Sequence, residues 1–364
     1  MSNLSVLIML QRYEKTLSLQ HKTNQNDNQN MKKLFATTLL TMILCLSSHA
    51  QEQFWLGADI SGTTELEARG EKLYNKHGNI RENTALMKEL GLNAIRLRVW
   101  VNPRGGFCSK EDVLAMAKRA KYYDMAIMID FHYSDWWADP GKQPIPATWQ
   151  YFSYDEMKYA LAEHTKETLQ LLKDNHIDVR WVQVGNETTN GFLWPMGRAE
   201  DNMQQYAGLT EAGYQAVKSV FPNATVIIHL DGGCDIHRYN FIFDGLRQYG
   251  AHWDMIGMSV YPYWDKEAGL TATYQETISK VVENIKALNH KYGCELMIVE
   301  TGTEAKKPKE GKNIMQALIK AARTQCDNHC KGVFYWAPEL EGQYPLGAFQ
   351  NHRPTEIMDA FANP

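Results

Sequence analysis

The stretch VRWVQVGNE, residues 179–187, is a short run of β-branched and aromatic residues that ends in an Asn-Glu pair. Residues of these types favour a strand that packs into a core. A carboxylate is unexpected at the end of a buried strand, because an ionised group loses its hydration there. The meaning of Glu187 therefore depends on the sheet that contains this strand.

Seven more runs of this kind occur in the chain. The eight predicted strands are FWLGADIS (54–61), AIRLRVW (94–100), AIMIDFHYS (126–134), VRWVQVGNE (179–187), TVIIHLDG (225–232), MIGMSVYPY (255–263), ELMIVETG (295–302) and VFYWAPE (333–339). Between them, apolar residues at three- and four-residue spacing predict helices, for example at 83–91, 110–124 and 274–293. Eight alternations of strand and helix predict an α/β fold, a (β/α)8 TIM barrel.

A doubly wound sheet is the alternative α/β architecture. It is disfavoured because no G-x-G-x-x-G phosphate loop follows any of the strands. No Pro/Gly/Ser-rich linker interrupts residues 51–364, so we expect these residues to form a single catalytic domain.

The first 50 residues have the pattern of a leader. MKKLFATTLLTMILCLSSHA (31–50) has two lysines, an apolar stretch and a small residue at Ala50, as a secretory signal peptide does. Residues 1–30 are interpreted as an over-extended start before Met31. We therefore expect an exported protein that is periplasmic, secreted or held at the cell surface. No later apolar run is long enough to predict a transmembrane segment.

The charge and the aromatic content of the chain indicate which kinds of partner it can bind. A formal net charge of −4 and a pI near 6.3 argue against nucleic acid as a partner, because the basic surface that attracts it is missing. Ten Trp and 18 Tyr favour stacking on flat apolar faces, including those of sugar rings. We expect a monomer.

Five cysteines follow the leader, namely Cys108, Cys234, Cys294, Cys326 and Cys330. An odd number leaves at least one thiol unpaired in an exported protein. The segment CDNHC (326–330) allows either a small disulfide loop or two free thiols. The Cys/His spacing of a zinc site is absent from the sequence.

Polar side chains gather where the predicted strands end. In a TIM barrel the carboxyl ends of the strands and the loops after them form the active site. The residues at these ends are Asp59, Arg96, Arg98, Trp100, Asp130, His132, Asn186, Glu187, Tyr261, Tyr263, Glu300 and Trp336. A core needs hydrophobic side chains, so this coincidence favours a functional site.

Taken singly, these residues also have ordinary structural interpretations. A lone Glu can belong to an ion pair, and two buried Arg need acidic partners. His132 alone can be a hydrogen-bonded core residue, and Trp336 alone can serve packing.

Glu187 and Glu300 end predicted strands that lie across the barrel mouth from each other. Two carboxylates placed in this way suit glycoside cleavage, in which one protonates the leaving oxygen and the other attacks the sugar. The first needs a raised pKa and the second must be ionised. The Arg side chains of strand 94–100 could keep Glu300 charged, and Asn186 could bind a sugar hydroxyl.

The chain resembles a known family from about Phe54 to its C-terminus. The motifs are GADIS, LNAIRLRVWVNP, DFHYSDWWADPGKQPIPATW, VGNE, IGMSVYPYW, IVETG and FYWAPE. They are similar to those of the arabinogalactan endo-β-1,4-galactanases, glycoside hydrolase family 53, within clan A of the retaining glycoside hydrolases. The long DFHYSDWWADPGKQ segment is specific, whereas Asn-Glu alone is shared by many clan members.

The resemblance implies cleavage of internal β-1,4-galactosidic bonds of galactan by double displacement. It implies that Glu187 is the acid/base, that Glu300 is the nucleophile, and that Asn186 binds the 2-hydroxyl of the sugar being cleaved. The other residues expected to bind substrate or to line its site are Asp59, Arg98, His132, Asp135, Trp137, Tyr261, Tyr263 and Trp336. Among these, Tyr261 is expected to hold Glu300, and Trp336 to be a floor under the sugar.

No cofactor or metal is expected. Bacterial relatives can carry calcium between long loops after the seventh and eighth strands, but TGTEAKKPKEG (301–311) is short and rich in lysine. Several ammonium groups beside a dication are unfavourable.

Two alternatives stay open at this point. One is another clan A endo-glycanase, such as a mannanase or cellulase. The other is a carbohydrate-binding protein that has lost catalysis, although such a protein would have no need of both carboxylates.

Overall fold

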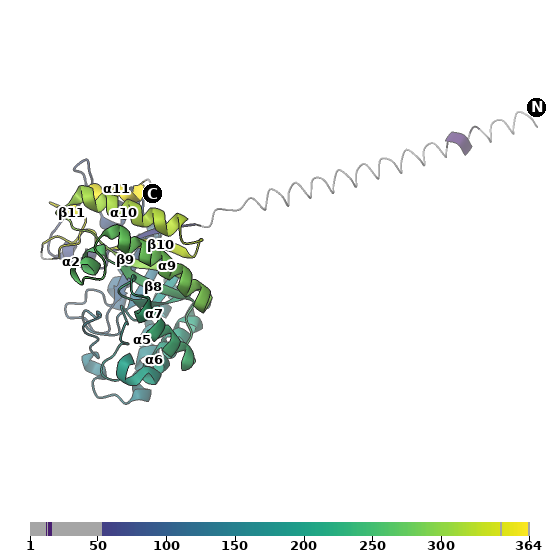
Figure 1. The fold of residues 1–364 in the computed structure, drawn as a ribbon, viewed down its shortest axis with the longest axis vertical. Helices are drawn as coiled ribbons and strands as arrows, with labels where there is room; N and C mark the ends of the chain where they lie inside the picture. Colours follow the sequence, from purple (N-terminus) through teal and green to yellow (C-terminus); the bar gives the residue numbers. More distant parts are fainter. Residues whose placement is uncertain (1–11, 13, 17–52, 343, 363–364) are drawn as a thin grey trace, which may run out of the picture. The chain divides into compact units, whose positions relative to one another are not determined.

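The structure is a computed structural model that describes residues 12, 14–16, 53–342 and 344–362 (Figure 1). Most of the predicted leader, residues 1–50, lies outside the described residues, so its cleavage stays a prediction. The residues from Phe54 onward form one compact unit.

Eight parallel strands close into a barrel in the order β1-β10-β9-β8-β7-β6-β5-β4. They are β1 (Trp55–Asp59), β4 (Ala94–Val99), β5 (Ala126–Phe131), β6 (Trp181–Val184), β7 (Thr225–Leu230), β8 (Met255–Val260), β9 (Glu295–Thr301) and β10 (Cys330–Trp336). Each corresponds to one predicted strand. The prediction of a single-domain TIM barrel is therefore confirmed.

Helices follow the strands and surround the barrel (Figure 1). They are α2 (Thr63–Ala68), α3 (Asn83–Glu89), α4 (Lys110–Tyr122), α5 (Tyr154–Asp174), α6 (Ala199–Val220), α7 (Ile236–Gln248), α8 (Pro262–Glu267), α9 (Tyr274–Tyr292), α10 (Pro308–Thr324) and α11 (Asp359–Ala362). Short elements complete the fold: β2 (Leu73–Tyr74), β3 (Ile80–Arg81), β11 (Phe349–Gln350), β12 (Arg353–Pro354), and the 3₁₀ helices η1 (Ala147–Trp149) and η2 (Glu356–Met358).

Local sequence explains where the long helices begin and end. Ser153 and Glu156 form a reciprocal capping box at the start of α5, which satisfies backbone N–H groups that have no partner within the helix. Thr273 caps α9, and Gly293 ends it in the left-handed conformation that glycine adopts without strain.

The interior of the barrel is divided between an apolar and a polar part. Its apolar part contains Ala94, Met128, Trp181, Ile227, Met255, Met297, Val299 and Phe334. Gly57 is required beside it, because a Cβ there would lie 2.2 Å from the ring of Phe334. A larger core fills the space between strands and helices. The polar residues lie toward the carboxyl ends of the strands, where the sequence predicts the site.

The barrel strands end one to three residues before their predicted ends, and two of these differences move a predicted site residue into another element. β6 ends at Val184, so Glu187 lies in the following loop, and β8 ends at Val260, so Tyr263 belongs to α8. The first difference has a clear cause, since Gly185 (φ 88°) adopts a left-handed backbone that ends the extended strand.

The cysteines described by the structure, Cys108, Cys234, Cys294, Cys326 and Cys330, are all free thiols. Of the two possibilities left open for CDNHC, the structure has the separate thiols. Among the described residues, no helix has the length and apolarity needed to cross a membrane.

Candidate active site

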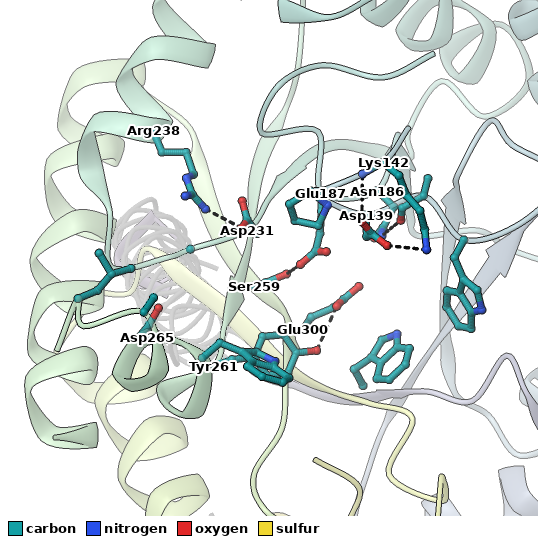
Figure 2. A pocket seen from close by; sticks show the side chains of 18 of the residues that line it. Asp139, Lys142, Asn186, Glu187, Asp231, Arg238, Ser259, Tyr261, Asp265 and Glu300 are labelled. Atoms are coloured by element: carbon teal, nitrogen blue, oxygen red, sulfur yellow. Dashed lines mark hydrogen bonds and ion pairs between the residues drawn. The ribbon is translucent and has the colours of Figure 1, made fainter. Parts of the chain in front are cut away.

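A cavity of about 460 Å³ opens at the carboxyl ends of the strands. Glu187 and Glu300 both line it, and Figure 2 shows their side chains converging on its centre. The other predicted site residues that line it are Trp137, Asn186, Tyr261 and Trp336. The structure thus brings six of the predicted residues into one cavity.

The backbone around Glu187 is unusual. Glu187 has φ 46°, a left-handed conformation that is uncommon for residues other than glycine. Gly185 nearby cannot be replaced easily, because a Cβ there would lie 2.4 Å from Cγ2 of Thr188. Such strained conformations persist where the surroundings hold them, often at active sites. Here the turn directs the Glu187 side chain into the cavity.

Glu300 comes from β9 and meets a cation and a phenol. Its Oε1 is 2.8 Å from Nη1 of Arg96, and Tyr261 donates its hydroxyl proton to Oε2 at 3.1 Å. Burial raises the pKa of Glu300 to about 7, while Arg96 and the Tyr261 hydrogen bond act in the opposite direction. The predicted contact between Tyr261 and Glu300 is present.

Glu187 has a different environment. Ser259 donates its hydroxyl proton to Glu187 Oε1 at 2.6 Å. Burial, followed by the charges of Glu300 and Asp231, raises the pKa of Glu187 well above its ordinary value. Because Glu300 contacts a guanidinium and Glu187 contacts a neutral hydroxyl, Glu187 is the carboxyl better suited to hold a proton.

Arg96 organises the polar part of the barrel. Its Nη1 lies 2.8 Å from Asp59, and its Nη2 lies 2.9 Å from Asp130 and 2.8 Å from Oδ1 of Asn186. The sequence suggested that an Arg of this strand keeps Glu300 charged, and the structure assigns that contact to Arg96. Asp59 is 1% exposed and binds Arg96 without lining the cavity.

Arg98 and His132 are buried behind the cavity wall. The guanidinium carbon of Arg98 is 3.8 Å from the ring centroid of Trp137, a cation–π contact that supports this wall. His132 Nε2 is 3.0 Å from Asp130, and its Nδ1 accepts the backbone N–H of Ala138. Burial lowers the pKa of His132, so the ring is neutral, with its proton on Nε2.

Asp135 and Tyr263 lie away from the cavity. Asp135 accepts backbone N–H groups from Asn102 and Ala147, so it fastens loops together. Tyr263 packs edge-on against Trp264 and lines a separate cavity of about 280 Å³ beside α9. The expectation that Tyr263 stands at the end of a strand is therefore wrong, because α8 begins directly after Tyr261.

Aromatic rings line the main cavity, among them Trp137, Trp336 and Tyr344. Trp336 lies edge-on to Trp137, with 5.7 Å between ring centroids, and edge-on to Tyr344 at 4.8 Å. Apolar ring faces beside hydrogen-bonding groups are suited to sugars, whose rings have apolar faces and polar edges. No group of three or more His, Cys, Asp or Glu among the described residues is arranged to hold a metal ion.

Several cavity residues were missed by the sequence prediction. Asp231 and Ser259 line the cavity, and His229 lies directly behind them in contact with Ser259. A signal was present, because TVIIHLDG ends in polar residues as the other strands do. Tyr344 carried no signal, since it lies in the loop after β10 and not at the end of a predicted strand.

Comparisons with known proteins agree with this geometry. Residues 55–348 match glycosyl hydrolase family 53. The chain is 33% identical to the probable arabinogalactan endo-β-1,4-galactanase A of Aspergillus fumigatus, over 72% of this chain and 73% of that protein. It is 31% identical to the endo-β-1,4-galactanase of Bacillus subtilis, over 79% of this chain and 70% of that protein.

Among solved structures, a fungal β-1,4-galactanase superposes with a TM-score of 0.77 at 26% identity. The match covers 85% of this chain and 99% of that chain. The family match spans the whole barrel, including the loops that carry Glu187 and Trp137. The chain belongs to glycosyl hydrolase family 53.

Proposed function

We propose that this protein is an exported endo-β-1,4-galactanase that cleaves internal bonds of β-1,4-galactan with retention of configuration. The observation that carries the proposal is the pair of carboxyls in one cavity with unequal surroundings, Glu300 beside Arg96 and Glu187 beside Ser259. The names of the relatives supply the substrate, and the leader pattern at 31–50 supplies export.

The proposed chemistry has two steps. In the first, Glu300 attacks the anomeric carbon while Glu187 gives its proton to the leaving glycosidic oxygen, which forms a galactosyl ester on Glu300. In the second, the ionised Glu187 takes a proton from water, and the resulting hydroxide displaces Glu300 from the anomeric carbon. Two inversions leave the β configuration unchanged.

Arg96 and Tyr261 stabilise Glu300 as a carboxylate before attack and as a leaving group afterwards. Asn186 has one donor and one acceptor group, and its Oδ1 is bound by Arg96 while its Nδ2 donates to the Ala138 carbonyl. These bonds fix the orientation of the amide before a sugar hydroxyl reaches it. The aromatic walls would hold the sugar face.

The test is hydrolysis of a substrate panel by the mature protein. We expect release of reducing ends from β-1,4-galactan and little from β-mannan or carboxymethyl-cellulose, with Glu300→Gln as the inactive control. Proton NMR should detect the β-anomer first, before mutarotation. Preference for mannan or cellulose would assign the other clan A function, and an α-anomer appearing first would reject the double displacement.

A further inference from the structure

A chain of three side chains leads from the barrel interior to Glu187. His229 Nε2 lies 2.8 Å from Ser259 Oγ, and Ser259 Oγ lies 2.6 Å from Glu187 Oε1. His229 is fully buried and Ser259 is 1% exposed. Figure 2 shows Ser259 directed toward Glu187.

The direction of these hydrogen bonds follows from the other nitrogen of His229. Nδ1 accepts the backbone N–H of Glu187 at 3.3 Å and lies 3.0 Å from the amide nitrogen of Gln183, which can only donate. Nδ1 also lies 3.1 Å from Asn186 Oδ1, but that oxygen already accepts from Arg96 Nη2 at 2.8 Å. The proton of the neutral imidazole is therefore on Nε2 and points at Ser259 Oγ. Burial and the charge of Arg96 lower the pKa of His229, which keeps the ring neutral.

A hydroxyl that accepts from His229 has its own proton free to donate, and Glu187 Oε1 is the acceptor within reach. Oε1 is then occupied by a donor, so the acidic proton of Glu187 is favoured on Oε2. No hydrogen bond or ion pair to Oε2 is formed by the residues that the structure describes. Oε2 is the oxygen left to meet the substrate.

We propose that His229 and Ser259 are a positioning pair that orients the Glu187 carboxyl and directs its acidic proton to Oε2. The proposal rests on the role of Glu187 as acid/base. Neither residue touches the substrate in this proposal. Both act through Glu187, and His229 also holds the strained loop after β6, because its Nδ1 accepts the Glu187 backbone N–H.

Other charged or titratable groups face Glu187 from the neighbouring elements. They are Arg96 from β4, Asp231 after β7, Tyr239 from α7, Tyr261 after β8, Glu300 from β9 and Tyr344 after β10. All of them remain when Ser259 is replaced, so the effect of the hydroxyl can be measured against a constant background.

The first variant is Ser259→Ala. Loss of a donor to the carboxylate destabilises the ionised form, so the alkaline limb of the kcat/KM profile on galactan should move to higher pH. We expect kcat to fall by about tenfold, the scale of one hydrogen bond to a charged group. Ser259→Thr keeps the hydroxyl, so its alkaline limb should lie at the wild-type pH. A limb that stays in place in Ser259→Ala overturns the proposal.

A matched pair of His229 variants tests the relay itself. His229→Gln can place an amide N–H near the position of Nε2, whereas His229→Asn places its polar atoms near Nδ1 and cannot reach Ser259. We expect His229→Asn to move the alkaline limb of kcat/KM to higher pH, as Ser259→Ala does. His229→Gln should move this limb less. The reverse order would contradict the relay.

Ser219→Ala is the control, because its hydroxyl donates to the Ala216 carbonyl in α6, outside the cavity. A direct titration separates this proposal from the proposed function. ¹³C NMR of the Glu187 carboxyl, assigned with Glu187→Gln, reads its pKa without substrate. Failure of wild type on galactan would reject the substrate, and an unchanged Glu187 titration in Ser259→Ala would reject the positioning pair.

Discussion

Two residues of the same type have different chemistry in this cavity because their neighbours differ. Glu300 meets the Arg96 guanidinium at 2.8 Å, which favours its ionised form. Glu187 receives only the hydroxyl of Ser259 and feels the negative charges of Glu300 and Asp231. The environment of each carboxyl, more than its place in the sequence, is the basis of the proposed roles of acid and nucleophile.

Amide variants of the two carboxyls should separate these roles. Glu300→Gln removes the nucleophile, so we expect loss of hydrolysis on both galactan and an activated aryl galactoside. Glu187→Gln should lose activity on galactan but still release the activated phenol, which needs no protonation. Steady-state kinetics on the two substrates measures the difference. Turnover of galactan at the wild-type level by either variant would remove that residue from the mechanism.

Arg96 bears on both the proposed catalysis and the stability of the fold. Replacement by Met leaves Asp59, Asp130 and Glu300 buried without their cation, which should lower the free energy of unfolding by about 3–5 kcal/mol. The pKa of Glu300 should rise, so the acidic limb of kcat/KM should move to higher pH. Urea unfolding and the pH profile measure the two effects.

The control is Arg81→Met, which breaks the exposed pair with Glu89. We expect it to cost less than about 1 kcal/mol. If Arg96→Met were as stable as this control, the buried network would not contribute to folding in the way argued here.

At the scale of elements, the loop between β5 and α5 forms one wall of the cavity. It carries Trp137, and Asp135 ties it by accepting backbone N–H groups of Asn102 at 3.0 Å and Ala147 at 2.8 Å. Arg98 then packs its guanidinium against the Trp137 ring. The wall is therefore held by contacts from the β4 loop and from within its own length.

Asp135→Ala should loosen this wall without touching the carboxyls. The loss of two hydrogen bonds to a carboxylate should reduce the free energy that holds the loop in place by about 1–3 kcal/mol. Because the loop forms a wall of the substrate cavity, we expect KM for galactan to rise several-fold with a smaller change in kcat. Thermal unfolding should change little. Asp155→Ala, with a side chain that is 88% exposed, is the control. A fall in kcat at constant KM would place Asp135 closer to the chemistry than this structure does.

The sequence predicted the elements of the fold better than their ends. Eight apolar runs with helical patterns between them were sufficient for the barrel, because hydrophobic periodicity reflects burial directly. The end of β6 was missed, since it depends on the left-handed backbone at Gly185. The position of Tyr263 was missed because α8 begins immediately after β8.

The same limit applies to the site. The two carboxyls were predicted, because several polar side chains coincide where the predicted strands of one barrel end. The sequence could not tell whether Arg96 or Arg98 contacts Glu300, since that depends on strand register. Both lie on the same face of β4, but Arg96 is level with Asp59 of β1 and Met128 of β5, whereas Arg98 is level with Asp130. Contacts such as Ser259 with Glu187 join different strands and need the closed barrel.

At the scale of the whole barrel, stability and function occupy different ends. The apolar interior around Trp181 and Phe334 is formed by hydrophobic side chains. The opposite end holds the carboxyls of Glu187, Glu300 and Glu339, whose pKa values are raised because burial removes water from the charge. The free energy of unfolding should therefore depend on pH through this end of the molecule.

Glu339, in the loop after β10, allows this dependence to be tested apart from catalysis. It is 4% exposed, and burial raises its pKa from 4.5 to about 8. The folded protein keeps this proton up to about pH 8, whereas the unfolded chain loses it near pH 4.5. Unfolding in that window releases a proton, so the free energy of unfolding should fall as pH rises, by at most about 1.4 kcal/mol per unit.

Glu339→Gln removes the titrating group and keeps its size and one acceptor oxygen. We expect the variant to resemble wild type near pH 4.5, where the wild-type carboxyl is protonated in the folded state, and to be the more stable of the two at pH 8. Urea unfolding at intervals between these values gives the slope for each protein. The control is Glu283→Gln on the exposed face of α9, which should leave the wild-type slope unchanged. Parallel slopes for wild type and Glu339→Gln would mean that Glu339 is ionised in the folded protein, and the loss of stability at high pH would then have to come from Glu187 and Glu300.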